Sequence, residues 1–132
     1  MSAMRLALCT LGLLTLGASA AATRPVPPLS AKAEKALEGR RPGKPVNCVS
    51  LTSLGSSEIV DQTAIIYKSS HKLWYVNRPD GGNCPALQRN RTLVTHLTMS
   101  QLCSLDIVRV IDSSSPVEFG SCGLGQFVPY TK

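Results

Sequence analysis

Cysteine is the residue type whose number and spacing say most about the chemistry of this 132-residue chain. The chain has five cysteines, of which Cys9 lies in the N-terminal apolar stretch. The other four, Cys48, Cys84, Cys103 and Cys122, follow one another at intervals of 36, 19 and 19 residues. Zinc sites usually take their ligands in close pairs, which these intervals do not provide, so we expect no metal site. Four such cysteines in a small chain indicate two disulfides if the chain is exported to an oxidising compartment. Three pairings are possible. We favour Cys48 with Cys122 and Cys84 with Cys103, because small β domains often bring their first and last strands together.

Residues suited to acid–base catalysis are few. The two histidines, His71 and His96, have no Asp or Glu at metal-ligand spacing, and no hydrolase or phosphate-loop motif occurs in the sequence. Asp106 could act as a general acid or base, but an Asp at the start of a strand more often accepts backbone N–H bonds and fixes a turn. We therefore predict no catalytic residue, no cofactor and no enzymatic activity. A catalytic site assembled from distant segments is the alternative.

Two neighbouring segments are candidates for a binding surface. Trp74 and Tyr75 are adjacent, so on a strand their side chains would point to opposite faces. One would fill the core, and the other would be exposed for binding. The alternative is that the strand is buried on both faces or is covered by the N-terminal segment. Residues 78–83 (RPDGGN) have the strongest turn composition in the chain, and function concentrates on such loops. Our candidate binding residues are therefore Trp74, Tyr75, Arg78 and Asp80.

The N-terminus has the three parts of an export signal. Arg5 supplies a positive charge, residues 6–17 form an apolar stretch of 12 residues, and Ala18-Ser19-Ala20 matches a signal-peptidase site. The apolar stretch is shorter than the roughly 20 residues that span a bilayer. We predict that residues 1–20 are a signal peptide and that the protein is secreted or periplasmic. Cleavage would lower the net charge from +6 to +5, because Arg5 is lost, and would lower the number of cysteines from five to four, because Cys9 is lost.

The remaining sequence divides by composition near residue 47. Residues 21–47 form a basic, proline-rich arm with five prolines and six basic against two acidic side chains. Within this arm, Ser30 is a suitable N-cap for a short helix over Ala31–Glu38. Residues 48–132 contain the four cysteines and all six aromatic residues, with seven basic and six acidic side chains. We interpret them as a β domain stabilised by disulfides.

Short segments rich in β-branched residues alternate with turn signals in this domain. Thr63–Lys68 and Lys72–Asn77 flank a compact turn and predict a hairpin. Asp106–Asp112 alternates apolar and polar residues as a strand does, and Gly123-Leu124-Gly125 would separate the last two strands. About six to seven short strands without a long helix predict an all-β domain, either a small barrel or a compact sandwich, with one short N-terminal helix and two disulfides.

Six segments spread over about residues 37–130 form a pattern: LEGRRPGKPVNC (37–48), IVDQTAIIY (59–67), WYVN (74–77), NCPAL (83–87), LCSLDIVRVID (102–112) and GSCGLGQFVPY (120–130). The last two segments are the most specific. Together the six resemble a group of short exported proteobacterial proteins of unknown function. In similar sequences the stretch before the aspartate often reads Cys-x-Gly-Asp, and Leu105 stands here in the place of that glycine. The resemblance implies export, a β-rich fold and structural cysteines, and it implies no activity.

These features favour an exported, non-catalytic β domain with a binding or envelope-structural role. The alternative is a secreted inhibitor of an envelope-directed hydrolase, with residues 78–83 as its contact loop. We expect a protein or an envelope component as partner rather than nucleic acid, because the arm has no aromatic residue that could stack on bases. The basic arm could add a weak electrostatic contact with a membrane surface. We expect a monomer.

Overall fold

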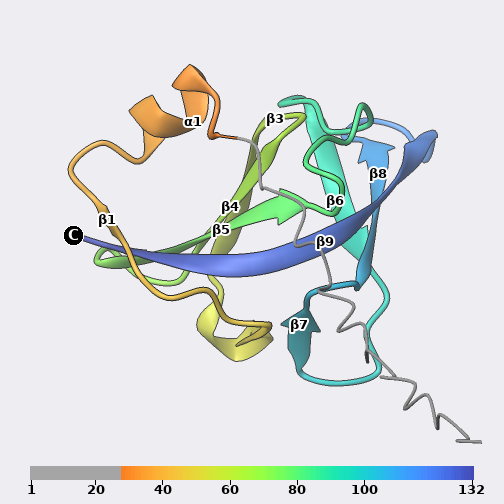
Figure 1. The fold of residues 1–132 in the computed structure, drawn as a ribbon. Coiled ribbons are helices and arrows are strands. Elements are labelled where there is room, and N and C mark those ends of the chain that lie inside the picture. Colours follow the sequence, from red (N-terminus) through yellow and green to blue (C-terminus); the bar gives the residue numbers. More distant parts are fainter. Residues whose placement is uncertain (1–27) are drawn as a thin grey trace, which may run out of the picture.

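The computed structural model describes residues 28–132, and the predicted signal peptide, residues 1–20, lies outside this range. A seven-stranded antiparallel sheet has the strand order β3-β4-β5-β9-β8-β6, with β1 added along β9. The sheet curves into a nearly closed barrel, which β9 crosses as one long strand (Figure 1). A separate two-stranded sheet, β2-β7, lies at one end. The prediction of an all-β fold with one short helix and two disulfides is confirmed, in its barrel form.

The bounds of the elements in chain order are α1 (Ala31–Ala36), β1 (Arg41–Pro42), β2 (Cys48–Ser50), the 3-10 helix η1 (Leu51–Ser53), β3 (Ser56–Asp61), β4 (Ala64–Lys68), β5 (Leu73–Pro79), β6 (Arg91–Thr95), β7 (Gln101–Cys103), β8 (Ile107–Asp112) and β9 (Glu118–Thr131). The predicted hairpin is present as β4 and β5. The predicted strand over Asp106–Asp112 is present as β8, one residue shorter.

The prediction of two separate strands at the C-terminus is wrong. β9 continues for 14 residues, pairing with β8 through its first half and with β5 through its second. Its glycines permit close approach and bending instead of ending the strand. At Gly125 a Cβ atom would lie 2.2 Å from the carbonyl oxygen of Arg78, so only glycine fits without a backbone shift. A Cβ on Gly123 would make an ordinary contact, 3.6 Å from that of Asp80.

The apolar residues of β4 are buried on both faces of the sheet and contribute to two separate cores. Ile65 and Tyr67 point into the barrel, where they pack with Phe127. Ala64 and Ile66 point outward, into a second core that α1 covers. This alternation follows from the two-residue period of a strand, and it explains why β4 reads as an almost continuous apolar run.

The pairing of cysteines that we favoured is wrong. Cys48 bonds to Cys103 and Cys84 bonds to Cys122, with Cα atoms 4.0 and 6.0 Å apart. Cys48 lies on β2, whose antiparallel partner is β7 and not the last strand, so Cys48 stands directly opposite Cys103. The Cys48–Cys103 bond holds the small sheet near the surface, whereas Cys84 and Cys122 are buried in the barrel core.

The helix of the arm begins where the sequence predicted, at the Ser30 cap, whose hydroxyl accepts from the Ala33 N–H (3.2 Å), but it ends at Ala36. The Ser30 hydroxyl also donates to Asp61 at the end of β3. Thr63 adds a backbone N–H (2.8 Å) and a hydroxyl (2.7 Å) to the same carboxylate. Burial works to raise the pKa of Asp61, but these hydrogen bonds, with the charge of Lys32, hold it below the ordinary value. Asp61 therefore fastens the start of α1 to the barrel as a carboxylate.

Candidate functional site

A groove of about 680 Å³ runs along the outer face of β9 where it pairs with β5. Its floor comes from β5 and β9, one wall comes from the arm, and the others come from the turns after β5 and β7. The residues that line it are Leu29, Pro45, Asn47, Val76, Arg78, Pro79, Asp80, Gly81, Gly82, Ser104, Leu105, Leu124, Gly125, Gln126, Val128 and Tyr130. The size and the mixture of an apolar lining with a few polar groups are typical of binding clefts.

The turn after β5 is held by backbone hydrogen bonds and brings Asp80, one of the predicted site residues, to the groove. The Gly82 N–H donates to the Pro79 carbonyl (2.8 Å), and the Asp80 N–H donates to the carbonyl of Gly123 on β9 (2.9 Å). Gly81 and Gly82 have φ values of +79° and +83°, which glycine adopts at little cost. The Asp80 side chain is therefore presented on an ordered turn and lines the groove.

Arg78 connects the groove to the arm. Its guanidinium Nη2 donates to the carbonyl of Pro28 (3.0 Å), the first residue that the structure describes. Its positive charge also acts on the Tyr130 phenol, whose pKa burial raises and the Arg78 charge lowers, with a net rise. The groove thus presents a guanidinium, a carboxylate and a neutral phenol among apolar side chains.

Leu105 forms the opposite wall in an unfavourable backbone conformation. It has φ +74°, the only positive value among the non-glycine residues of 28–132, and its side chain is 74% exposed. The turn is held by hydrogen bonds from the Ser104 N–H to Asn47 (2.6 Å) and from the Leu105 N–H to Leu124 (2.8 Å). The Asp106 carboxylate accepts the Cys103 N–H (2.7 Å), which confirms the interpretation of Asp106 as a turn-fixing residue. The tight turn therefore forms with a leucine at its left-handed position.

The floor of the groove rests on a buried polar pair that the sequence did not reveal. The Asn77 side chain is fully buried, and its amide donates to the Gly125 carbonyl (2.7 Å) while its oxygen accepts the Gly125 N–H (3.1 Å). These bonds replace ladder bonds at the register shift between Asn77 and Pro79. The sequence did contain a signal, because Asn77 and Gly125 both interrupt apolar strand segments. It did not indicate which glycine would pair with Asn77.

Trp74 and Tyr75 lie outside this groove, although both were candidate binding residues. Tyr75 packs against the barrel core, and Trp74 packs on the opposite face against the core under α1. The Arg40 guanidinium of the arm lies 3.5 Å from the centre of the Trp74 ring and donates to the carbonyl of His71 (2.9 Å). The structure thus agrees with the alternative in which the arm covers the second aromatic residue.

The histidines do not come near the groove carboxylate. His71 is exposed in the turn between β4 and β5, His96 is exposed after β6, and neither lines the groove. Within residues 28–132 no group of three or more metal-ligating side chains converges. No helix in that same part of the chain is long and apolar enough to cross a membrane. The two disulfides fit an oxidising, extracellular-type environment.

Comparisons with protein-family models, curated proteins and solved structures gave no match to this chain. The resemblance to short exported proteobacterial proteins therefore stays a prediction.

Proposed function

We propose that this chain is an exported, non-catalytic domain that binds a protein or an envelope component in the groove between the arm, the turn over residues 79–82 and Leu105. The observation that carries the proposal is the combination of a left-handed backbone and an exposed side chain at Leu105. A left-handed backbone costs an ordinary residue about 1–2 kcal/mol, and glycine would remove that cost. The leucine side chain is largely exposed, so burial within this chain does not repay it. Backbone strain of this kind clusters at functional sites, and an exposed apolar residue on a groove wall is a suitable anchor for a partner.

The polar groups of the groove support the same proposal. Arg78 and Asp80 stand near an apolar floor whose backbone is fixed by the buried Asn77 pair. A preorganised surface of this kind loses little conformational entropy when a partner binds.

The experiment is capture of partners from an envelope extract by the immobilised, disulfide-bonded protein. Leu105→Asn removes the apolar side chain and introduces a residue that tolerates a positive φ, so the turn should be retained. Ile107→Asn is the matched control, because Ile107 is similarly exposed (62%) and does not line the groove. We expect Leu105→Asn to reduce recovery of the specific partner by about tenfold and Ile107→Asn to leave it unchanged.

The remaining outcomes separate the alternatives. Equal recovery by both variants would contradict the groove as the binding site. Recovery of no partner by the wild-type protein would leave only an envelope-structural role. If the partner is a hydrolase whose activity falls when the protein is added, and replacement of residues 78–83 abolishes this effect, the inhibitor alternative is the correct one.

A further inference from the structure

A second cavity lies in the gap where the barrel does not close. The gap lies between β3 and β6, the two strands at the ends of the strand order. At one end of the gap the guanidinium of Arg89, just before β6, lies 3.8 Å from the carboxylate of Glu58 on β3. Toward the start of β3 and the end of β6 the gap holds a cavity of about 200 Å³. Its lining comes from five elements (η1, β3, β4, β6 and β7) and from the segment after η1. It consists of Leu51, Leu54, Gly55, Ser56, Ser57, Tyr67, Leu93, Thr95 and Leu102. It shares no residue with the groove described above.

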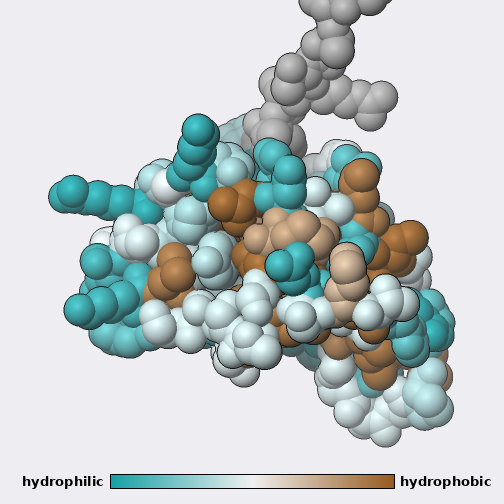
Figure 2. Space-filling view, turned by 90° about the horizontal axis from the view of Figure 1, so that it is seen from below, coloured by the Kyte–Doolittle hydropathy of each residue, from teal (hydrophilic) through white to brown (hydrophobic). Residues whose placement is uncertain are grey.

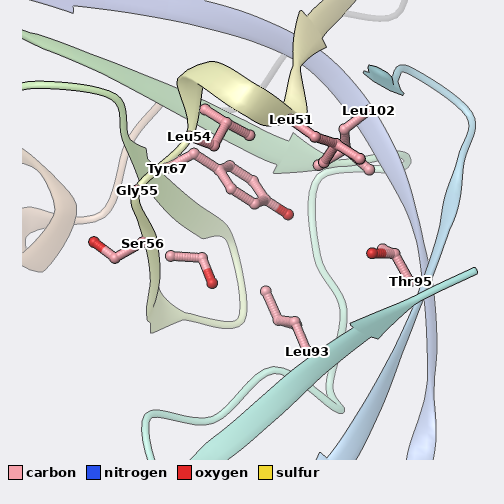
Figure 3. Close-up of a pocket in the computed structure, with 9 residues that line it drawn as sticks. Leu51, Leu54, Gly55, Ser56, Tyr67, Leu93, Thr95 and Leu102 are labelled. Atoms are coloured by element: carbon pink, nitrogen blue, oxygen red, sulfur yellow. The ribbon is translucent and has the colours of Figure 1, made fainter. Parts of the chain in front are cut away.

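The Tyr67 side chain reaches into this cavity from β4. Figure 3 shows its hydroxyl pointing into the space between Leu102 on one side and Leu93 and Thr95 on the other. Tyr67 is 6% exposed, and within residues 28–132 its hydroxyl has no hydrogen-bond partner. Burial raises the pKa of this phenol, so the hydroxyl stays protonated and able to donate.

An unpartnered buried hydroxyl is unfavourable, and proteins rarely keep one without a reason. Tyr67 does not need its hydroxyl for packing, because its ring already contacts Phe127 in the barrel core, with centroids 5.7 Å apart. A ligand that accepts a hydrogen bond inside the cavity would satisfy the group.

The rest of the lining defines what kind of molecule fits. Four leucines line the cavity together with Ser56, Ser57 and Thr95, which carry hydroxyl groups, and none of the lining residues is charged. An enclosed apolar cavity of roughly 150 Å³ accommodates benzene. The present cavity of about 200 Å³ is open to solvent on one side and has room for a substituted ring or a chain of similar size. Figure 2 views the end of the barrel that carries η1 and β7, and shows apolar surface gathered near the middle of that face. Leu51 of η1, 37% exposed, lies at the rim of the cavity.

We propose that this cavity is a binding site for a small, uncharged and mostly apolar molecule whose single acceptor atom takes a hydrogen bond from the Tyr67 hydroxyl. The leucines supply the apolar contact and Tyr67 supplies the selectivity. This site is separate from the groove and independent of the groove's function.

The test is an NMR titration of the disulfide-bonded protein with two probes of matched size. Acetophenone carries a carbonyl acceptor, and ethylbenzene lacks one. We expect saturable shifts at the methyl groups of Leu54, Leu93 and Leu102 with both probes. In Tyr67→Phe the affinity for acetophenone relative to ethylbenzene should fall about fivefold, which is the effect of one net hydrogen bond. Tyr75→Phe is the matched control and should leave this ratio unchanged.

A second variant separates the cavity from a general surface effect. Leu93→Trp adds bulk to a half-buried cavity residue on an edge strand, so it should abolish the shifts with both probes while the far-ultraviolet spectrum is retained. The proposal is overturned if neither probe gives saturable shifts at these leucines. It is equally overturned if Tyr67→Phe leaves the ratio of the two affinities unchanged.

Discussion

Removing each disulfide in turn should destabilise the protein to different extents and in different ways. The Cys48–Cys103 bond spans 55 residues and the Cys84–Cys122 bond spans 38. The loop-entropy model assigns about 4 kcal/mol to each. That is a large fraction of the roughly 5–15 kcal/mol by which a domain is usually stable. On loop length alone, the two variants would be almost equal.

The two disulfides differ in burial, so the two variants should not lose the same free energy of unfolding. Cys84 and Cys122 are 7% and 4% exposed within the barrel core, so replacing both with alanine removes two packed sulfur atoms and leaves a void. A cavity of that size adds roughly 1 kcal/mol. Cys48 is exposed, and its bond holds a two-stranded sheet of three residue pairs that would be marginal alone. We therefore expect a loss of about 5 kcal/mol for the buried pair and about 4 kcal/mol for the Cys48–Cys103 pair.

The assay is urea unfolding of the two double-alanine variants, followed by circular dichroism, together with amide exchange. The variant without Cys48 and Cys103 should show fast exchange at Val49 and Leu102, because the small sheet opens before the barrel does. The reasoning is refuted if this variant is the less stable of the two, or if its fast exchange extends through β4 and β5.

Three further predictions test particular contacts. Leu105→Gly should raise the free energy of unfolding by up to about 1 kcal/mol, because relief of the left-handed backbone outweighs the added entropy that glycine gives the unfolded chain. Thermal unfolding measures this change. A melting temperature below that of the wild-type protein would contradict the strain argument. Gly125→Ala should lower the free energy of unfolding by about 2–3 kcal/mol, because its Cβ would lie 2.2 Å from a backbone carbonyl oxygen of β5. Gly123→Ala is the control: its Cβ makes only an ordinary contact, so it should be nearly neutral in the same urea experiment. The pKa of Asp61 is depressed in the folded state, so its stabilising effect on the arm is complete above about pH 4 and is lost as the pH falls through the folded pKa. Fluorescence of Trp74, which packs in the core under α1, should report this acid transition, and Asp61→Asn should weaken docking at neutral pH and flatten the transition.

Local signals predicted the local parts of the fold. The hairpin of β4 and β5 follows from a compact turn between two β-branched segments, and the Ser30 cap correctly placed the start of α1. The pairing of distant strands has no such local signature. Cys48 pairs across to β7, although the residues just before it do approach the last strand, as the bridge between Val46 and Phe127 shows. The expectation that the strand of Cys48 meets the last strand was thus wrong, and the segment that pairs with β9 is β1 of the arm.

The site was predictable to a similar degree. The turn composition of residues 78–83 identified Arg78 and Asp80, which the structure brings to one groove. The opposite wall at Leu105 could not be placed, because it depends on the tertiary contact of the turn after β7 with β9. The role of Tyr67 could not be predicted either. An aromatic residue in an apolar strand is interpreted as a core residue whether or not its hydroxyl has a hydrogen-bond partner.

Peptide mapping without reduction, on protein isolated from its native location, tests most directly the claim of an exported domain stabilised by two disulfides. The account predicts a mature N-terminus at residue 21 and two cross-linked peptide pairs, joining Cys48 to Cys103 and Cys84 to Cys122. Four free thiols, or an intact N-terminus beginning at Met1, would contradict it.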